Sequence, residues 1–261
     1  MAHVGAGAGR TRAFGERRVI SYRREPGSTD EYSVPLCSAR LSFDGVATRR
    51  TLAAPPHPTP RNTPETHPLY AARMSSLPTF DDDALDGARS HWHWRGQARP
   101  AFAVATRPGQ ESVWDYPRPP RLEIDPREVV VRWGDLEVAR STCAIRALET
   151  AHPPSFYIPL ADIAPGVLEP AEGTSLCEWK GPARYWSLVD GARRLAKVAW
   201  SYPRPLPGSE LLGDGVAFYC HALECSVGGA IVAPQPGGFY GGWITPELAG
   251  PFKGEPGSEG W

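Results

Sequence analysis

Lysine and methionine are scarce in this chain of 261 residues, and its N-terminal part has no tryptophan. The chain has three lysines against 25 arginines, its two methionines are Met1 and Met74, and its nine tryptophans all lie from Trp92 onward. The first 73 residues contain no lysine and no tryptophan, but 11 arginines and 6 acidic residues, a formal charge of +5. From Met74 onward the formal charge is −6. The two parts are therefore different kinds of polypeptide.

The N-terminal part also lacks the apolar residues that a core needs. The stretch "AAPPHPTPRNTPETHP" (53–68) has no sustained period of 2 or 3.6 and buries too little apolar surface to offset its ordering entropy. We expect residues 1–91 to be a disordered or mis-annotated N-terminal extension. Within it, the first 73 residues either precede a true start at Met74 or are a basic tail for an acidic partner. Residues 92–261 are expected to form a single β-rich domain with an irregular aromatic C-terminal wrap.

Paired cysteine motifs and long apolar runs are missing as well. The chain has five cysteines, Cys37, Cys143, Cys177, Cys220 and Cys225. Their odd number and the lack of a C-x-x-C motif argue against a disulfide framework and against a zinc site. We expect free thiols in the cytoplasm, with no metal and no cofactor. No segment reaches membrane-spanning length, so we expect a soluble protein with no membrane partner. The acidic balance after Met74 argues against a nucleic-acid partner.

Short strands and tight turns dominate what is present. Residues 127–141 alternate apolar and polar side chains on both sides of Gly134-Asp135, which predicts a hairpin. A second hairpin is expected over 175–202, with its turn at Asp190-Gly191, and at least one more strand over 215–227.

One helix is expected, near 142–151. Ser141 is a possible cap, Ile145 and Leu148 are spaced like an apolar stripe, and the prolines after His152 would stop the helix. The expected fold is thus mainly β (β-rich α+β), with short antiparallel strands in two packed sheets or a small open barrel.

The hexapeptide Trp-x-Tyr-Pro-Arg-Pro occurs twice, next to each hairpin. On an extended chain the Trp and Tyr point to one side, and the prolines stiffen the strand end. Two such corners can line opposite walls of a cleft, or can merely pack as corners. They supply six candidate ligand-binding residues: Trp114, Tyr116, Arg118, Trp200, Tyr202 and Arg204.

Two of the rare lysines stand in aromatic-Lys-Gly triplets, at Lys180 and Lys253. An ammonium is a compact charge that can lose its proton when buried, which a guanidinium cannot do. We therefore take Lys180 as a candidate catalytic residue, although a turn lysine beside glycine is the plainer interpretation. Cys177 is a second candidate, because a nearby ammonium can lower the pKa of a thiol. Trp179 and Tyr185, in the same hairpin, are candidate ligand-binding residues.

Glu149 and His152 lie three positions apart at the end of the predicted helix. A carboxylate and an imidazole so placed can serve as acid and base, or the histidine can cap the helix. We include both among the catalytic candidates.

These motifs resemble a bacterial family known as domain of unknown function 427. The resemblance rests on "WHWRGQARPAFA", "ESVWDYPRPP", "ALETAHPPSFYIP", "LCEWKGPARYW", "AWSYPRPLPG" and "PGGFYGGWITPELAGPFKGEPGSEGW", within 92–261. It implies a compact β-rich domain with two antiparallel sheets set at a steep angle. The family is sometimes labelled a nucleotidyltransferase, an activity that needs a Gly-Ser turn followed by paired acidic Mg²⁺ ligands. This chain has Gly208-Ser209 but no D-x-D after it.

Three functions are therefore in competition. The first is a small-molecule pocket, possibly catalytic, between the two hairpins. The second is a non-enzymatic recognition module that uses an aromatic and arginine surface. The third, nucleotidyl transfer, is disfavoured by the missing acidic pair. The sequence leaves the ligand and the oligomeric state open.

Overall fold

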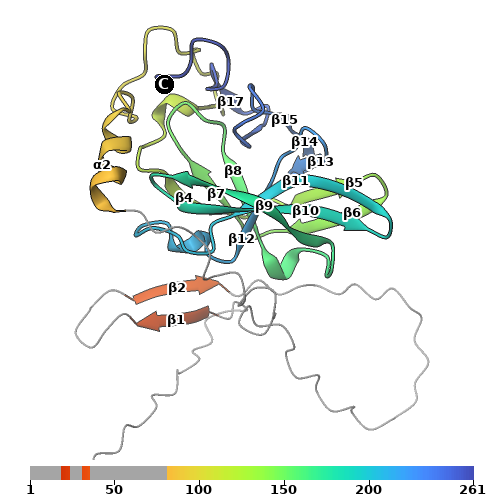
Figure 1. The fold of residues 1–261 in the computed structure, drawn as a ribbon. Coiled ribbons are helices and arrows are strands. Elements are labelled where there is room, and N and C mark those ends of the chain that lie inside the picture. Colours follow the sequence, from red (N-terminus) through yellow and green to blue (C-terminus); the bar gives the residue numbers. More distant parts are fainter. Residues whose placement is uncertain (1–18, 24–30, 36–80) are drawn as a thin grey trace, which may run out of the picture. The chain divides into compact units, whose positions relative to one another are not determined.

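The computed structural model describes residues 19–23, 31–35 and 81–261 (Figure 1). Two compact units divide the chain, Met1–Leu52 and Ala53–Trp261. In the first unit, β1 (Val19–Arg23) pairs with β2 (Glu31–Pro35) in an antiparallel ladder. Apart from these two strands and residues 81–91, the predicted N-terminal extension lies outside the described residues, so its disorder stays a prediction.

In the described residues of the second unit the α-helix is α2 (Asp82–Ser90), not the segment predicted from the sequence. The side chain of Asp81 caps it by accepting a hydrogen bond from the amide of Ala84 at 2.7 Å. Acidic residues occupy the first turn and Arg89 occupies the last, an arrangement that complements the helix dipole. Leu85 is the one buried residue of this helix, and Arg89 also ties the helix to the domain by donating from Nε to the carbonyl of Glu178 at 3.0 Å.

The predicted helix near 142–151 is wrong, because Ala144–Leu148 form strand β7. Ser141 does not cap a helix; its hydroxyl donates to Asp162 at 2.6 Å and accepts from the amide of Cys143 at 3.0 Å. The three-residue spacing of Ile145 and Leu148 fits a helix stripe equally well, so local spacing is ambiguous here. Pairing with two neighbouring strands decided the conformation, because tertiary contacts override weak helix propensity.

The larger sheet has seven antiparallel strands in the order β4-β7-β8-β12-β11-β10-β9. Its ends, β4 and β9, do not pair with each other, so the sheet stays open instead of closing into a barrel. The strands are β4 (Arg121–Asp125), β7, β8 (Ser155–Pro159), β9 (Leu168–Cys177), β10 (Gly181–Asp190), β11 (Arg193–Ser201) and β12 (Gly215–Phe218).

The smaller sheet has four strands in the order β14-β13-β5-β6. They are β5 (Val129–Trp133), β6 (Leu136–Ser141), β13 (Glu224–Val227) and β14 (Ala230–Ile231). Both predicted hairpins are confirmed: β5 and β6 join through Gly134, and β10 and β11 join through Gly191. Both glycines have positive φ, 59° and 58°, which is the reason these turns need glycine.

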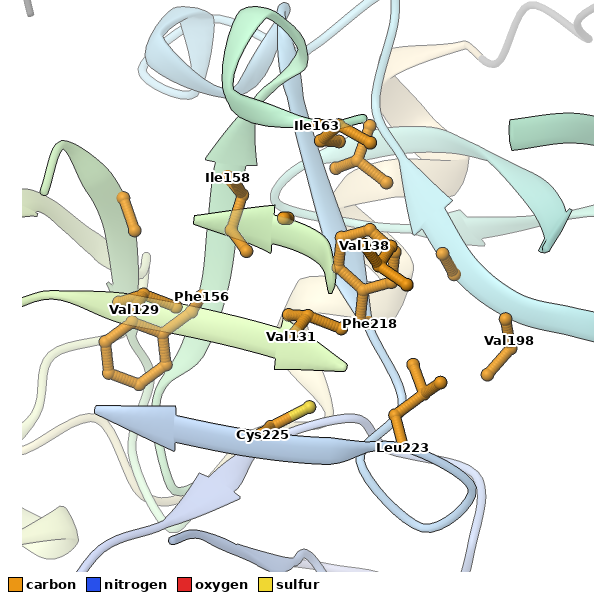
Figure 2. Packing of buried hydrophobic residues seen from close by; sticks show 14 of the residues in the cluster. Val129, Val131, Val138, Phe156, Ile158, Ile163, Val198, Phe218, Leu223 and Cys225 are labelled. Carbon is orange, nitrogen blue, oxygen red and sulfur yellow. The ribbon is translucent and has the colours of Figure 1, made fainter. Parts of the chain in front are cut away.

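The main core lies between the two sheets (Figure 2). Val129 and Val131 of β5 and Cys225 of β13 meet Phe156 and Ile158 of β8, while Phe218 of β12 lies beside them. Trp243, fully buried, stacks on Phe156 and donates its indole N–H to the carbonyl of Phe218 at 2.8 Å. Core residues thus come from one face of each sheet, as expected for two packed layers.

The opposite face of the larger sheet carries a second buried cluster. Because side chains alternate along a strand, Tyr157 points away from Phe156 and Ile158, and Ala217 points away from Phe218. The register joins these alternate residues into one row across four strands, Tyr185↔Trp200↔Ala217↔Tyr157. This row of large aromatic rings around a small alanine forms the base of the candidate site.

The C-terminal segment from Ala233 onward consists of short strands joined by turns. Its short strands are β15 (Ala233–Pro234), β16 (Trp243–Ile244) and β17 (Leu248–Ala249), of which β17 pairs in parallel with β3 (Glu111–Ser112). Trp94, Trp114 and Trp261 belong to a third cluster, and the exposed ring of Phe102 packs against all three. The described residues also contain three single 3-10 turns: Val113–Asp115, Leu160–Asp162 and Glu210–Leu212. In the described part of the chain, no helix is long and apolar enough to cross a bilayer.

Candidate functional site

A pocket of about 290 Å³ opens above the aromatic row. Its base and walls are largely aromatic, and a charged pair stands at one side. Its aromatic lining includes Trp92, Tyr157, Tyr185, Trp200, Tyr202, Tyr219 and Tyr240. Its polar lining includes Glu149, His152, Cys177, Glu178, Lys180 and Gln235.

Glu149 and Lys180 form the charged pair. Glu149 follows the end of β7, and Lys180 stands in the turn between β9 and β10, so two separate strand ends bring them together. The ammonium of Lys180 donates to Oε2 of Glu149 at 2.8 Å, and Nε of Arg118 donates to Oε1 at 3.3 Å. Both carboxylate oxygens are therefore bonded to cations. The three side chains are 14%, 11% and 0% exposed in the order Glu149, Lys180, Arg118, so solvent screens the pair little.

The charges of this pair are fixed at neutral pH. Burial alone would raise the pKa of Glu149, but the charges of Lys180 and Arg118, joined by that of His152 in the acid range where the imidazole is protonated, outweigh it and bring the pKa to about 2. Burial also disfavours the Lys180 ammonium, but the negative charge of Glu149 beside it raises its pKa well above the ordinary value. Glu149 is thus a carboxylate and Lys180 an ammonium throughout the physiological range.

His152 is held neutral, with its proton on Nε2. The amide of Gly242 donates to Oε1 of Gln235 at 3.1 Å, which identifies the other end of that side chain as the amide nitrogen. This nitrogen donates to the carbonyl of Lys253 at 2.8 Å and to Nδ1 of His152 at 2.9 Å. Burial lowers the pKa of His152 to about 4, and the charges of Arg118 and Lys180 add to this effect. The imidazole therefore offers an Nε2–H donor to the pocket.

Cys177 and the tyrosines of the base are neutral donors too. Burial raises the pKa of the Cys177 thiol, and the nearby Lys180 ammonium offsets this only in part. Burial likewise raises the pKa of Tyr157 to about 12 and that of Tyr202 well above its ordinary value. The hydroxyl of Tyr157 accepts from the indole N–H of Trp200 at 3.3 Å, which leaves its own proton available to the pocket.

The expectation of free thiols holds for three cysteines of the described residues, Cys177, Cys220 and Cys225.

The first copy of the doubled hexapeptide supports the site from behind. Trp114 and Tyr116 are buried in the third cluster, outside the pocket lining, and the Tyr116 hydroxyl donates to Glu111 at 2.7 Å. Arg118, by contrast, reaches Glu149, and its Nη2 donates to the carbonyl of Thr150 at 2.9 Å. The first corner therefore fixes the carboxylate.

The second copy supports the lysine and also faces the pocket. Trp200 and Tyr202 line it directly. The amide of Leu206, just after this corner, donates to the carbonyl of Lys180 at 3.1 Å. A Cβ at Gly181 would meet the carbonyl oxygen of Arg204 at 2.9 Å, so the corner approaches the lysine turn closely. Each corner thus holds one member of the Glu149–Lys180 pair.

Two other predicted residues contribute backbone or packing. Trp179 is buried below the guanidinium groups of Arg89 and Arg95, and its carbonyl accepts from Ser209 at 3.2 Å. The side chain of Arg204 is half-buried and lies outside the pocket lining, as does Trp179.

Lys253, the lysine of the second triplet, has a structural environment. Its ammonium donates to the carbonyl oxygens of Ser258, Glu259 and Trp261 at 2.9, 2.7 and 3.0 Å. The Lys253 ammonium also lies 4.6 Å from the ring centroid of Trp92, and the guanidinium of Arg118 lies 4.4 Å from the same centroid. Lys253 therefore anchors the C-terminal wrap next to the pocket.

Sequence reasoning missed several lining residues. Tyr157 is a polar-tipped residue between two apolar ones on a strand, which is a signal that it faces away from the main core. Gln235 and Tyr240 come from the irregular C-terminal segment, and Trp92 lies between α2 and β3, so no periodicity marks them. Only the tertiary structure brings them to the pocket.

Comparison with known proteins identifies the domain. Residues 121–229 match the family model described as a domain of unknown function (DUF427). The resemblance expected from the motifs is thereby confirmed for this stretch, which contains Glu149, Lys180 and Trp200. No curated protein matches the chain.

Proposed function

We propose that this DUF427 domain protein binds a small, flat molecule carrying a carboxylate or a similar group of acceptor oxygens. The observation that supports this most strongly is the ammonium of Lys180. It is oriented by Glu149 and reaches the pocket lining, and its single hydrogen bond within the described residues uses one of three N–H groups. Two further N–H groups are available to a ligand.

Neighbouring groups add donors of the same kind. The Nε2–H of His152 and the hydroxyl of Tyr157 lie in the same lining as Lys180. Within the part of the chain that the structure describes, the Nε2–H of His152 and the hydroxyl proton of Tyr157 have no acceptor. Two of the three N–H groups of Lys180 have none either, because the third donates to Glu149. Several hydrogen-bond donors in one partly buried pocket favour a ligand whose oxygens accept hydrogen bonds. Such an oxygen takes the place of a water molecule at these donors at little cost in free energy.

Shape and walls indicate a flat ligand of modest size. The ring centroids of Trp200 and Tyr219 lie 4.5 Å apart, and those of Tyr240 and His152 lie 4.6 Å apart. Aromatic walls favour planar groups, which stack or pack edge-on against them. A volume of about 290 Å³ is at the small end of metabolite pockets, so a single ring with its substituents fits best.

Free donors, rather than net charge, favour an acceptor group over a cation. Arg118 and Lys180 are offset by Glu149 and by Glu178, which also lines the pocket. The Oε1 of Glu178 already accepts the indole N–H of Trp92, and both carboxylate oxygens of Glu149 are bonded to cations. The only cationic side chain that the described lining presents to a ligand is Lys180.

Binding fits these residues better than acid–base catalysis does. A general acid or base works best with a pKa near the operating pH. Glu149 and His152, with pKa values of about 2 and 4, do not change charge near neutrality, and burial keeps the Cys177 thiol protonated. The site therefore holds its charges constant, which suits recognition.

Calorimetric titration with matched single-ring probes tests the proposal. Benzoate and nicotinate carry the acceptor group, benzamide is neutral, and benzylamine is a cation of the same shape. We expect the two carboxylates to bind and benzylamine not to bind. Lys180→Met should weaken carboxylate binding by about tenfold to 100-fold, because a hydrogen bond to a charged group contributes about 1.5–3 kcal/mol.

The matched control is Lys197→Met, which removes the exposed lysine of β11 and leaves the pocket lining unchanged. Equal binding of benzylamine and benzoate, or full carboxylate affinity in a folded Lys180→Met protein, would overturn the proposed function. Circular dichroism at the titration temperature verifies that each variant is folded.

A further inference from the structure

A second hollow of about 170 Å³ adjoins the pocket. Tyr219, Gln235, Tyr240 and Gly241 line both. The remaining lining of the second hollow comes from the end of β12 and from the C-terminal wrap: Cys220, His221, Pro234, Gly238 and Gly242.

The chemistry of the second hollow differs from that of the pocket. No Lys, Arg, Asp or Glu belongs to its described lining, which is made of rings, a thiol, a proline and glycine backbone. The amide of Gln235 is occupied on both sides, by Gly242 at Oε1 and by Lys253 and His152 at Nε2. The hollow therefore offers mostly apolar surface, and a polar ligand group would lose its hydrogen bonds to water there.

The two hollows meet at Gly241, which lines both. Gly241 has no side chain, and a Cβ there would meet Cη2 of Trp200 at 2.0 Å, so its backbone packs directly on the indole ring. The hydroxyl of Tyr219 donates to the carbonyl of Phe239 at 3.4 Å, which ties the wrap to the sheet beside this boundary. A ligand above Trp200 can extend over Gly241 without meeting a side chain at that residue.

We propose that the second hollow is a subsite for an apolar arm of the ligand whose acceptor group binds beside Lys180. The inference rests on the proposed function and adds the substrate class to it: an amphiphilic aromatic acid rather than a bare one. An engineered apolar cavity of about 150 Å³ accommodates benzene, so a hollow of about 170 Å³ accepts a chain or ring of about six carbons.

A pair of probes that differ only in the arm tests the subsite. Benzoate presents the head alone, and 4-butylbenzoate adds a four-carbon arm. We expect 4-butylbenzoate to bind the wild-type protein at least tenfold more tightly than benzoate. Cys220→Phe, which fills the hollow, should abolish this gain and leave benzoate binding unchanged, whereas Cys220→Ala should preserve the gain.

The Cys220 thiol gives a second measurement that needs no variant. Cys220 is free and half-buried in the hollow lining, so its alkylation by N-ethylmaleimide reports occupancy. Peptide mapping should show that 4-butylbenzoate slows alkylation of Cys220 and that benzoate at equal saturation does not. This measurement stands even if Cys220→Phe fails to fold.

The possible outcomes separate the two proposals. If benzoate binds through Lys180 but the arm gives neither tighter binding nor protection of Cys220, the subsite is refuted and the proposed function survives. If the arm gives both tighter binding and protection of Cys220 while Lys180→Met leaves the affinity for benzoate unchanged, the hollow binds apolar groups and the proposed function fails. If neither probe binds or protects, both proposals are overturned.

Discussion

The ammonium of Lys180 lies 2.8 Å from Oε2 of Glu149, although 31 positions separate the two residues in the chain. This contact joins the end of β7 to the turn before β10 and so crosses most of the larger sheet. Each residue is held in turn by one copy of the doubled hexapeptide. The repeat therefore has a structural role that also positions the two charges of the candidate site.

Removing Lys180 should destabilise the protein. Loss of one partner from a buried ion pair costs about 3–5 kcal/mol, because the remaining charge is left without compensation. Since Glu149 keeps Arg118, we expect the lower end, about 3 kcal/mol, for Lys180→Met in urea unfolding. Lys197→Met, at an exposed position, should change the free energy of unfolding by about 0.5 kcal/mol or less.

The double variant Glu149→Gln/Lys180→Met isolates the interaction energy between the two residues from their interactions with the rest of the protein. If the two residues interact as described, the double variant loses less stability than the two single losses together. Strict additivity would show that the ion pair does not contribute as a pair.

Glu149 should also make the fold sensitive to acid. Its pKa in the folded protein, about 2, lies below its ordinary value of 4.5. The unfolded chain therefore binds the proton first, and the stability that Glu149 contributes is present above about pH 4.5 and is lost as the pH falls towards 2. The loss is on the order of 3 kcal/mol, and Glu149→Gln should remove it.

Urea unfolding at a series of pH values measures this effect. Glu172→Gln, which changes an exposed residue of β9, is the control and should keep the full acid dependence of the wild type. An identical pH profile for wild type and Glu149→Gln would contradict the assignment of a low pKa to Glu149.

His152 should stay neutral well below its usual range. We expect its nitrogen resonances to show the Nε2–H tautomer at pH 6 and to titrate at about pH 4. Because this folded-state pKa lies below the ordinary 6.5, the unfolded chain takes up the proton first, and stability should fall as the pH drops from 6.5 towards 4.

Gln235→Glu gives a directional test of this environment. A carboxylate beside Nδ1 would favour the imidazolium, so the pKa of His152 should rise in this variant. A His152 pKa that does not respond would show that Gln235 does not set its tautomer.

Trp243 should be the most costly tryptophan to remove from the core. It is fully buried, stacks on Phe156 at 5.3 Å between ring centroids, and leaves the Phe218 carbonyl unpaired when deleted. Trp243→Ala should cost about 3–5 kcal/mol of unfolding free energy. Trp133→Ala, which removes a half-exposed ring near Arg193, should cost about 1 kcal/mol or less. Thermal and urea unfolding of both variants measure the difference.

The sequence alone determined the fold class and both hairpins. Alternating apolar residues and the Gly134 and Gly191 turns depend on local rules of side-chain direction and backbone conformation, which need no knowledge of the rest of the chain. The rarity of lysine pointed to Lys180, and the doubled hexapeptide to Arg118, Trp200 and Tyr202, all of which meet in or behind one pocket.

Tertiary structure decided the rest. The segment Ala144–Leu148 is a strand because two neighbours pair with it, and spacing alone could not distinguish this from a helix. Alternation along a strand separates two faces, but only the packing of the second sheet decides which face becomes core and which carries the pocket. Trp114 and Trp200 begin identical motifs and still lie in different clusters, because the strands around each differ. The Glu149–Lys180 contact depends on sheet order, which no local pattern encodes.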